Sequence, residues 1–158
     1  MKSKTCCFIG HRQAKRTEEL KRKIEEIVCE LIVKYGVEKF LFGSKSDFDD
    51  ACYQVVTAIK EKKFNNIERV YVRAEYSKIT DEYIKYLLKS YEETYMPQKV
   101  ERAGKGRYVV RNKEMIEISA IVVFYYDEEN AREKSGTKIA YEYAKKKGKR
   151  IINIIEKT

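Results

Sequence analysis

Short apolar runs alternate with helical patterns along this chain, and the alternation limits the folds that the sequence can adopt. Five runs are typical of buried β-strands: 6–9, 40–42, 70–72, 120–125 and 151–155. Between them, apolar residues recur every three or four positions, as in amphipathic helices. Strands that alternate with helices are joined by right-handed crossovers and form a parallel sheet. The sequence therefore predicts an α/β fold of about five mostly parallel strands with helices on both faces, and places the most apolar run, 120–125, inside the sheet.

Length and composition favour one globular domain over residues 1–158. The 158 residues are 43% hydrophobic and 37% charged, which provides enough apolar material for a core. No apolar run has the length of a membrane span, and the apolar part of the first ten residues is too short for a signal peptide. We therefore expect a cytoplasmic protein with no membrane partner.

The chain has a formal net charge of +9, but its basic residues are interspersed with acidic ones. The stretches EELKRKIEE at 18–26 and AIKEKKF at 58–64 are typical of solvated helix faces. The positive charge favours anionic ligands in general. It does not define a nucleic-acid-binding face, so nucleic acid is not the expected partner.

The four cysteines, at positions 6, 7, 29 and 52, have the spacing of core residues rather than of metal ligands. No two of them form a CxxC pair, and His11 is the only histidine. The sequence thus predicts buried reduced thiols, with no disulfide, no metal site and no cofactor.

Ligands of a parallel sheet bind beyond the carboxyl ends of its strands, which makes five segments candidates for a site. They are Gly10-His11-Arg12, Gly43-Ser44-Lys45-Ser46, Arg73-Ala74-Glu75, Tyr126-Asp127 and Ser135-Gly136-Thr137. The second and the fifth open helices, where unpaired N–H groups and the positive end of the helix dipole favour a phosphate. Neither has the glycine spacing of a P-loop or of GxGxxG, so an ordinary helix cap is the alternative. Together on one sheet edge, with Arg12 and Arg73, they predict a pocket for a nucleotide-like, phosphate-bearing ligand.

Single residues in these segments have more than one interpretation. His11 is either a hydrogen-bonded turn residue or a ligand contact. Arg12 either grips a phosphate or pairs with a surface acid. Glu75 and Asp127 either contact ribose hydroxyls or act as a general base, or they are surface carboxylates. Core packing explains most of the tyrosines, and one or two at the sheet edge, Tyr76 or Tyr126, are candidates for stacking on a base.

Four longer stretches follow one another over nearly the whole chain: FIGHR at 8–12, FGSKSDFDDAC at 42–52, YVVRNKEMIEISAIVVFYY at 108–126 and SGTKIAYEYAKKKGKRIINI at 135–154. In this order they resemble the SLOG superfamily of nucleotide-binding domains, and in particular its small YpsA-like branch in Gram-positive bacteria and phages. The resemblance implies a Rossmann-like three-layer sandwich, a homodimer, and a nucleotide or NAD-derived ligand that is sensed or sequestered.

The LOG enzymes of this superfamily cleave the base from nucleoside monophosphates, using an arginine in a short RK-x-x-M helix start and a glutamate just after a GT turn. The resemblance adds Arg111 and its neighbour Asn112 to the expected ligand contacts. Gly136-Thr137 resembles the GT turn, but the nearest acid, Glu142, comes a few residues late. Binding is therefore expected rather than hydrolysis. The alternative is a (phosphoribo)hydrolase that uses Arg111 and Glu142, and a further alternative is single-stranded nucleic-acid binding. The loop 127–134 is shorter than is common in the YpsA-like branch.

Overall fold

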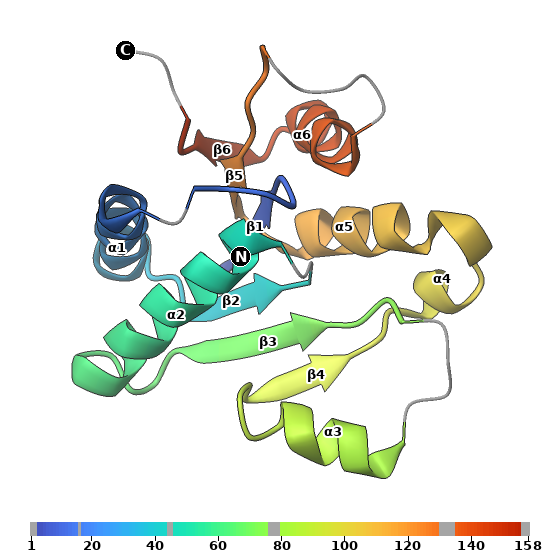
Figure 1. Ribbon diagram of the computed structural model, residues 1–158, viewed down its shortest axis with the longest axis horizontal. Helices are drawn as coiled ribbons and strands as arrows, with labels where there is room; N and C mark the ends of the chain where they lie inside the picture. Colours follow the sequence, from blue (N-terminus) through green and yellow to red (C-terminus); the bar gives the residue numbers. More distant parts are fainter. Residues whose placement is uncertain (1–2, 16, 44–45, 76–79, 130–134, 156–158) are drawn as a thin grey trace.

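The computed structural model describes residues 3–15, 17–43, 46–75, 80–129 and 135–155. Within these ranges, six strands form one sheet in which all neighbouring pairs are parallel (Figure 1). The strands are β1 (Thr5–Gly10), β2 (Lys39–Phe42), β3 (Glu68–Val72), β4 (Glu93–Tyr95), β5 (Ile121–Tyr125) and β6 (Arg150–Asn153). Their spatial order is β4-β3-β2-β1-β5-β6.

Helices cover both faces of this sheet and give a Rossmann-like three-layer sandwich. The helical elements are α1 (Glu18–Val33), α2 (Asp47–Lys62), α3 (Asp81–Leu87), α4 (Gln98–Glu101), the 3-10 turn η1 (Gly104–Gly106), α5 (Arg107–Ile118) and α6 (Gly136–Lys146). In Figure 1, α1 and α6 lie on opposite sides of β5 and β6. Alternate residues of each strand face the two helical layers, as the two-residue period of a strand requires. On β1, for example, Phe8 packs with α1 and α2, whereas Cys7 packs with α5 and α6.

The structure confirms the α/β class, the parallel sheet and the interior position of the run 120–125, since β5 pairs with both β1 and β6. Two features differ from the sequence analysis. The sheet has six strands rather than about five, because β4 adds an edge strand, and α4 and η1 follow it. The helix α5 begins at Arg107, so Arg111 lies one turn inside it rather than at its start, where the resemblance placed it.

Both differences arise because the sequence of these elements is largely polar. β4 is the three-residue edge strand Glu-Thr-Tyr, which has no apolar run to mark it. The first turn of α5 buries a charged side chain, Arg107, at a position where an amphipathic pattern would show an apolar one.

The strand order places a topological switch point between β1 and β5. From β1 the chain builds β2, β3 and β4 on one side, and it then returns to the other side of β1 to form β5. In open α/β sheets, the crevice at the carboxyl ends of two such strands is the usual place for a ligand. None of the helices in the described ranges combines the length and the apolar character needed to span a bilayer.

Gly10 lets the first turn of α2 approach the end of β1. A Cβ atom at this position would lie 2.6 Å from Phe48 Cδ2 and 2.9 Å from Phe48 Cβ, and Phe48 is fully buried. We expect Gly10→Ala to lower the free energy of unfolding by about 1–3 kcal/mol, the usual cost of overpacking, as measured by urea denaturation. Gly136→Ala is the matched control, because nothing lies within 4 Å of its Cβ position. Equal stability of the two variants would contradict this prediction.

Candidate functional site

A pocket of about 470 Å³ opens at the carboxyl ends of β1, β2 and β3, beside α5 and the start of α6. Nine predicted site residues line it: Gly10, Arg12, Gly43, Ser46, Glu75, Arg111, Asn112, Gly136 and Thr137. The remaining lining residues are Ile9, Tyr71, Ala74 and Tyr108. Ser44 and Tyr76 lie outside the described residues. Segments that are far apart in sequence thus meet at one edge of the sheet.

Arg111 is the most unusual residue of the pocket, because its guanidinium is buried without an ion pair to any described residue. Its side chain is 4% exposed. Nη1 donates to the carbonyl oxygen of Gly43, and Nε donates to Asn112 Oδ1 at 3.0 Å. Burial lowers the pKa of Arg111 from its ordinary value, although the carboxylates of Asp49 and Glu75 oppose this at longer range. A buried charge is normally paired, so this one is suited to an anion entering the pocket.

The absence of a side chain at Gly43 leaves room for the side chain of Arg111. A Cβ on Gly43 would lie 2.8 Å from Arg111 Cδ and 2.9 Å from Met115 Sδ. Any side chain here would therefore push Arg111 or Met115 aside. The glycine at the end of β2, which the sequence suggested as part of a phosphate turn, serves to seat the arginine of α5.

The N-terminus of α6 has donors that no described residue uses. Ser135 caps the helix, since its hydroxyl accepts from the amide of Lys138 and its carbonyl accepts from the amide of Ile139. The amides of Gly136 and Thr137 have no hydrogen-bond acceptor in the described residues. The first turn of α6 carries no acidic side chain. These two amides and the positive end of the helix dipole favour a negatively charged group.

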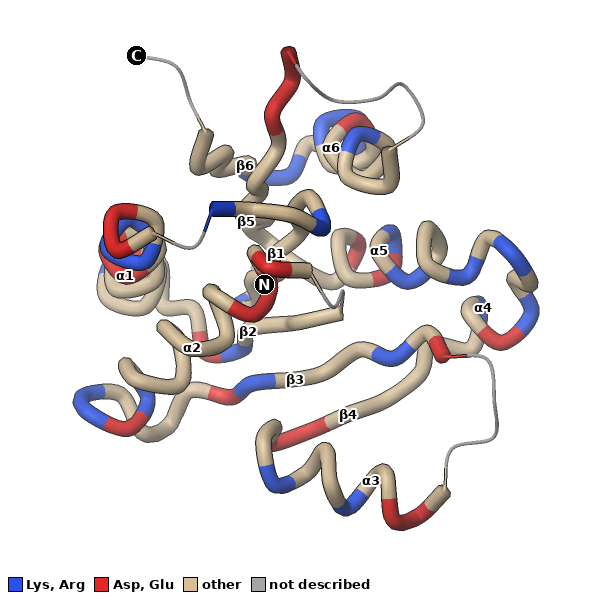
Figure 2. The backbone as a smooth tube through the Cα atoms, viewed as in Figure 1, with Lys and Arg blue, Asp and Glu red and all other residues tan. Residues whose placement is uncertain are grey.

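The N-terminus of α2, the other helix start predicted to hold a phosphate, is arranged differently. The amide of Asp47 donates to the carbonyl oxygen of Arg12 at 2.9 Å, and Ser46 accepts from the amide of Asp49 at 3.0 Å. Three carboxylates, those of Asp47, Asp49 and Asp50, lie in its first turn (Figure 2). Since they compensate the helix dipole, α6 is the better anion site of the two.

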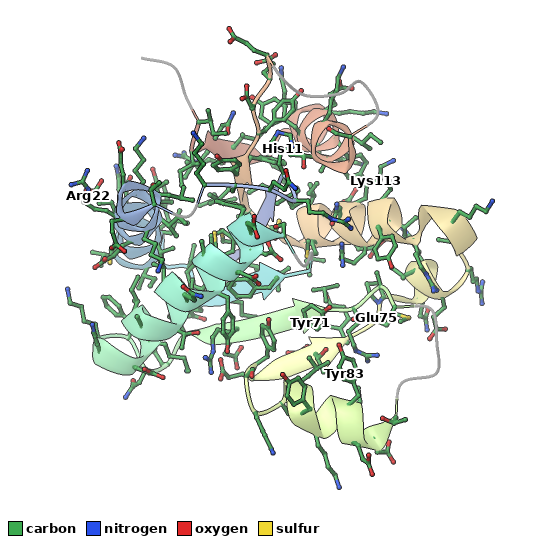
Figure 3. The ribbon with its side chains drawn as sticks, in the orientation of Figure 1. His11, Arg22, Tyr71, Glu75, Tyr83 and Lys113 are labelled. Atoms are coloured by element: carbon green, nitrogen blue, oxygen red, sulfur yellow. The ribbon has the colours of Figure 1, made fainter. Side chains whose placement is uncertain are left out.

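Glu75 supplies a carboxylate to the opposite end of the pocket, just beyond β3. Its Oε1 accepts hydrogen bonds from the hydroxyls of Tyr71, at 2.8 Å, and Tyr83, at 3.4 Å. Figure 3 shows Tyr71 and Glu75 near the end of β3, with Tyr83 on α3. The pocket is therefore bipolar, with cationic and N–H groups toward α5 and α6 and an acidic group after β3.

Two tyrosines that line the pocket were not among the site residues predicted from the sequence. Tyr71 is a buried residue of β3, and Tyr108 on α5 is 53% exposed. The Arg111 guanidinium lies over the Tyr108 ring, with its carbon 5.8 Å from the ring centroid. The only sequence signal for Tyr108 is its place one turn before Arg111. An exposed aromatic ring at a pocket mouth is suited to stacking on a flat ligand group.

Several predicted site residues do not line the pocket. Arg73 turns toward β4, where its Nε donates to Thr94 Oγ1 at 3.2 Å. Tyr126 is buried and packs on Tyr141, with ring centroids 4.7 Å apart. Glu142 is exposed on α6 and forms an ion pair with Lys138 at 4.0 Å. Two others, His11 and Asp127, are hydrogen-bonded to each other.

His11 links the ends of β1 and β5. Its amide donates to the carbonyl oxygen of Tyr125 at 3.2 Å, and its Nε2 accepts from the amide of Asp127 at 2.9 Å. This is the hydrogen-bonded turn residue that the sequence allowed. The contact requires an unprotonated Nε2, and burial lowers the pKa of the imidazole below its usual value, against an opposing effect of Asp127.

The His11 contact predicts a pH dependence of stability. Because the folded-state pKa is lower than the unfolded one, the contribution of His11 is complete above pH about 6.5 and is lost as the pH falls. We expect the stability advantage of wild type over His11→Gln to shrink from pH 8 to pH 5 by roughly a few tenths of a kcal/mol, since solvent screens a half-exposed ring. Urea denaturation measures this. The single histidine NMR signal should titrate below its ordinary value, and a raised pKa would contradict the prediction.

The cysteines lie in or beside the core rather than in the pocket. All four are free thiols, with Cys6, Cys7 and Cys52 buried and Cys29 half-buried. Burial raises the pKa of the Cys7 thiol to about 12, so it stays protonated at neutral pH. In the part of the chain that the structure describes, no group of three or more His, Cys, Asp or Glu side chains is placed to hold a metal ion.

No family model matches this chain, and no curated protein has a significant sequence match to it. The fold and the geometry of the pocket are therefore the basis for a functional proposal.

Proposed function

We propose that the pocket binds a nucleotide-like, phosphate-bearing small molecule, with its phosphate between the start of α6 and Arg111. The observation that carries this proposal is the buried guanidinium of Arg111, which has no ion pair among the described residues and lines the same pocket as two unused amides of α6. A phosphate satisfies both, because it carries negative charge and several acceptor oxygens.

The other lining residues fit the rest of such a ligand. Arg12 is exposed at the pocket, and only its backbone carbonyl is used by α2, so its side chain adds a second positive charge. Tyr108 presents an exposed ring on which a base can stack. Glu75 offers an acceptor beyond β3. The proposed role is that of a sensing or sequestering module related to the SLOG superfamily. The position of the pocket at the topological switch point supports this relationship.

The pocket gives less support to hydrolysis or to nucleic-acid binding. Glu142, the acid nearest to the GT turn, is exposed and paired with Lys138 rather than placed in the pocket. Acidic and basic residues are interspersed on α1 and α5 (Figure 2), and such mixed faces do not favour a polyanion. The homodimer and the cytoplasmic location stay predictions.

Calorimetric titration tests the proposal. The ligands are the four ribonucleoside 5′-monophosphates and NAD, with the matching nucleosides and inorganic phosphate as controls. We expect at least one nucleotide to bind at least about tenfold more tightly than its nucleoside, because the nucleoside lacks the anchoring group. Affinity should fall only modestly with salt, unlike phosphate-backbone binding. Nucleosides that bind as well as nucleotides, or no binding by any ligand, would overturn the proposal.

A further inference from the structure

A second cavity, of about 380 Å³, lies between α2 and α3, and Tyr71 is the only described residue that lines both it and the Arg111 pocket. Six of the described residues that line it are aromatic: Phe42, Tyr53, Tyr71, Tyr83, Tyr86 and Tyr91. We call it the aromatic cavity. Its described lining also includes two carboxylates and no basic side chain. In a chain of net charge +9, its character is thus opposite to that of the Arg111 pocket.

The aromatic rings hold one another in place. Tyr91 packs on Tyr53 and on Tyr71, with ring centroids 5.0 Å and 5.3 Å apart. From α3, Tyr83 and Tyr86 stack on each other with centroids 6.4 Å apart, and Figure 3 shows Tyr83 on this helix and Tyr71 on β3. Rings that are already packed lose little conformational freedom when a ligand binds.

The two carboxylates of the aromatic cavity, Asp49 and Asp50, belong to the first turn of α2. Burial raises the pKa of Tyr91 above its ordinary value, and Tyr53, Asp49 and Asp50 raise it further, against an opposing effect of Arg69. Both carboxylates therefore lie near enough to this ring to act on it. Asp49 is buried and Asp50 is exposed, so Asp50 is the one that a ligand can reach.

One ring of the aromatic cavity already has a cation of the protein over it. The guanidinium carbon of Arg69 lies 5.6 Å from the centroid of the Tyr53 ring, and its charge is paired with a glutamate 2.7 Å away. Arg69 does not line the cavity. No described lysine or arginine lies over the rings of Tyr83, Tyr86 or Tyr91. These three faces are left for a ligand.

We propose that the aromatic cavity binds a small organic cation of the quaternary ammonium class, with its charge against Tyr86 and Tyr91 and beside Asp50. The faces of aromatic rings attract cations, and a quaternary ammonium has no N–H group that would need an acceptor in the cavity. The volume is in the range of small-molecule sites. This inference goes beyond the proposed function and does not depend on it.

The first test compares ligands of one shape with and without charge. Titrations followed by the NMR signals of the tyrosine rings use choline, tetramethylammonium and the uncharged tert-butyl analogue of choline, in which carbon replaces nitrogen. We expect choline to bind wild type at least about tenfold more tightly than this analogue. Equal binding of the two, or no binding of either cation at about 10 mM, would overturn the proposal and leave the proposed function standing.

The second test assigns the residues. Tyr86 is 64% exposed, so Tyr86→Leu should leave the core intact. Choline affinity should fall about three- to thirtyfold in this variant, while binding of the uncharged analogue stays within about twofold of wild type. Asp50→Asn should weaken choline binding about two- to fivefold, the effect of an exposed charge pair.

Asp47→Asn is the matched control for Asp50→Asn. It removes a charge from the same first turn of α2, but Asp47 does not line the aromatic cavity. Its choline affinity should match that of wild type. Equal losses in the two aspartate variants, or unchanged choline affinity in folded Tyr86→Leu and Asp50→Asn proteins, would contradict the site.

Discussion

Gly136→Asp is expected to abolish nucleotide binding without destabilising the protein. Gly136 is the first residue of α6, and nothing lies within 4 Å of the position of a Cβ atom there. A carboxylate at a helix N-terminus stabilises the helix by about 0.3–1 kcal/mol, because it compensates the dipole. The same carboxylate would occupy the place of the phosphate and repel it. Affinity should therefore fall more than about a hundredfold while the free energy of unfolding stays equal or rises.

Gly136→Ala is the control for Gly136→Asp, since it adds a methyl group in open space without charge. Its affinity should stay within a few-fold of wild type in the same calorimetric titration. Urea denaturation of all three proteins measures the second half of the prediction. An aspartate variant that binds nucleotides normally would place the phosphate away from α6.

Arg111→Met is expected to weaken nucleotide binding by about 1.5–3 kcal/mol, or roughly 10- to 150-fold, the contribution of a charge-assisted hydrogen bond. Methionine has a similar length and lies beside the buried Met115 without a charge. Inorganic phosphate and nucleotides should be affected alike, because the lost group contacts the phosphate. Nucleosides, which lack that anchor, should bind the variant as they bind wild type.

Stability should change little in Arg111→Met because two effects oppose each other. The Gly43 carbonyl loses its hydrogen bond, which costs about 1–3 kcal/mol when an acceptor is left unsatisfied. Removal of a buried guanidinium without an ion pair is favourable by a comparable amount. We expect the free energy of unfolding to change by less than about 2 kcal/mol. Unchanged phosphate affinity in a folded Arg111→Met protein would show that Arg111 serves only to hold Gly43.

The position of the candidate site could be predicted from the sequence because it follows from local patterns and one topological rule. The glycines that end β1 and β2 and the Ser135-Gly136-Thr137 turn are visible in the sequence. The expectation that strand carboxyl ends share one edge then brings them together, as the pocket shows. The three acids at the start of α2 are visible too, and they were a signal that this helix start disfavours phosphate.

What the sequence determined by itself was the class of fold, the parallel sheet, the interior strand at 120–125 and the edge at which the candidate residues gather, since these follow from short-range periodicity. Only the tertiary structure decided which residues face the pocket. It buried Arg111 against Gly43, joined His11 to Asp127 by a hydrogen bond, turned Arg73 toward β4 and buried one oxygen of Glu75 without a hydrogen-bond partner among the described residues. The burial of a side chain and its hydrogen-bond partners depend on residues that are distant in the chain. Local sequence patterns therefore do not predict them.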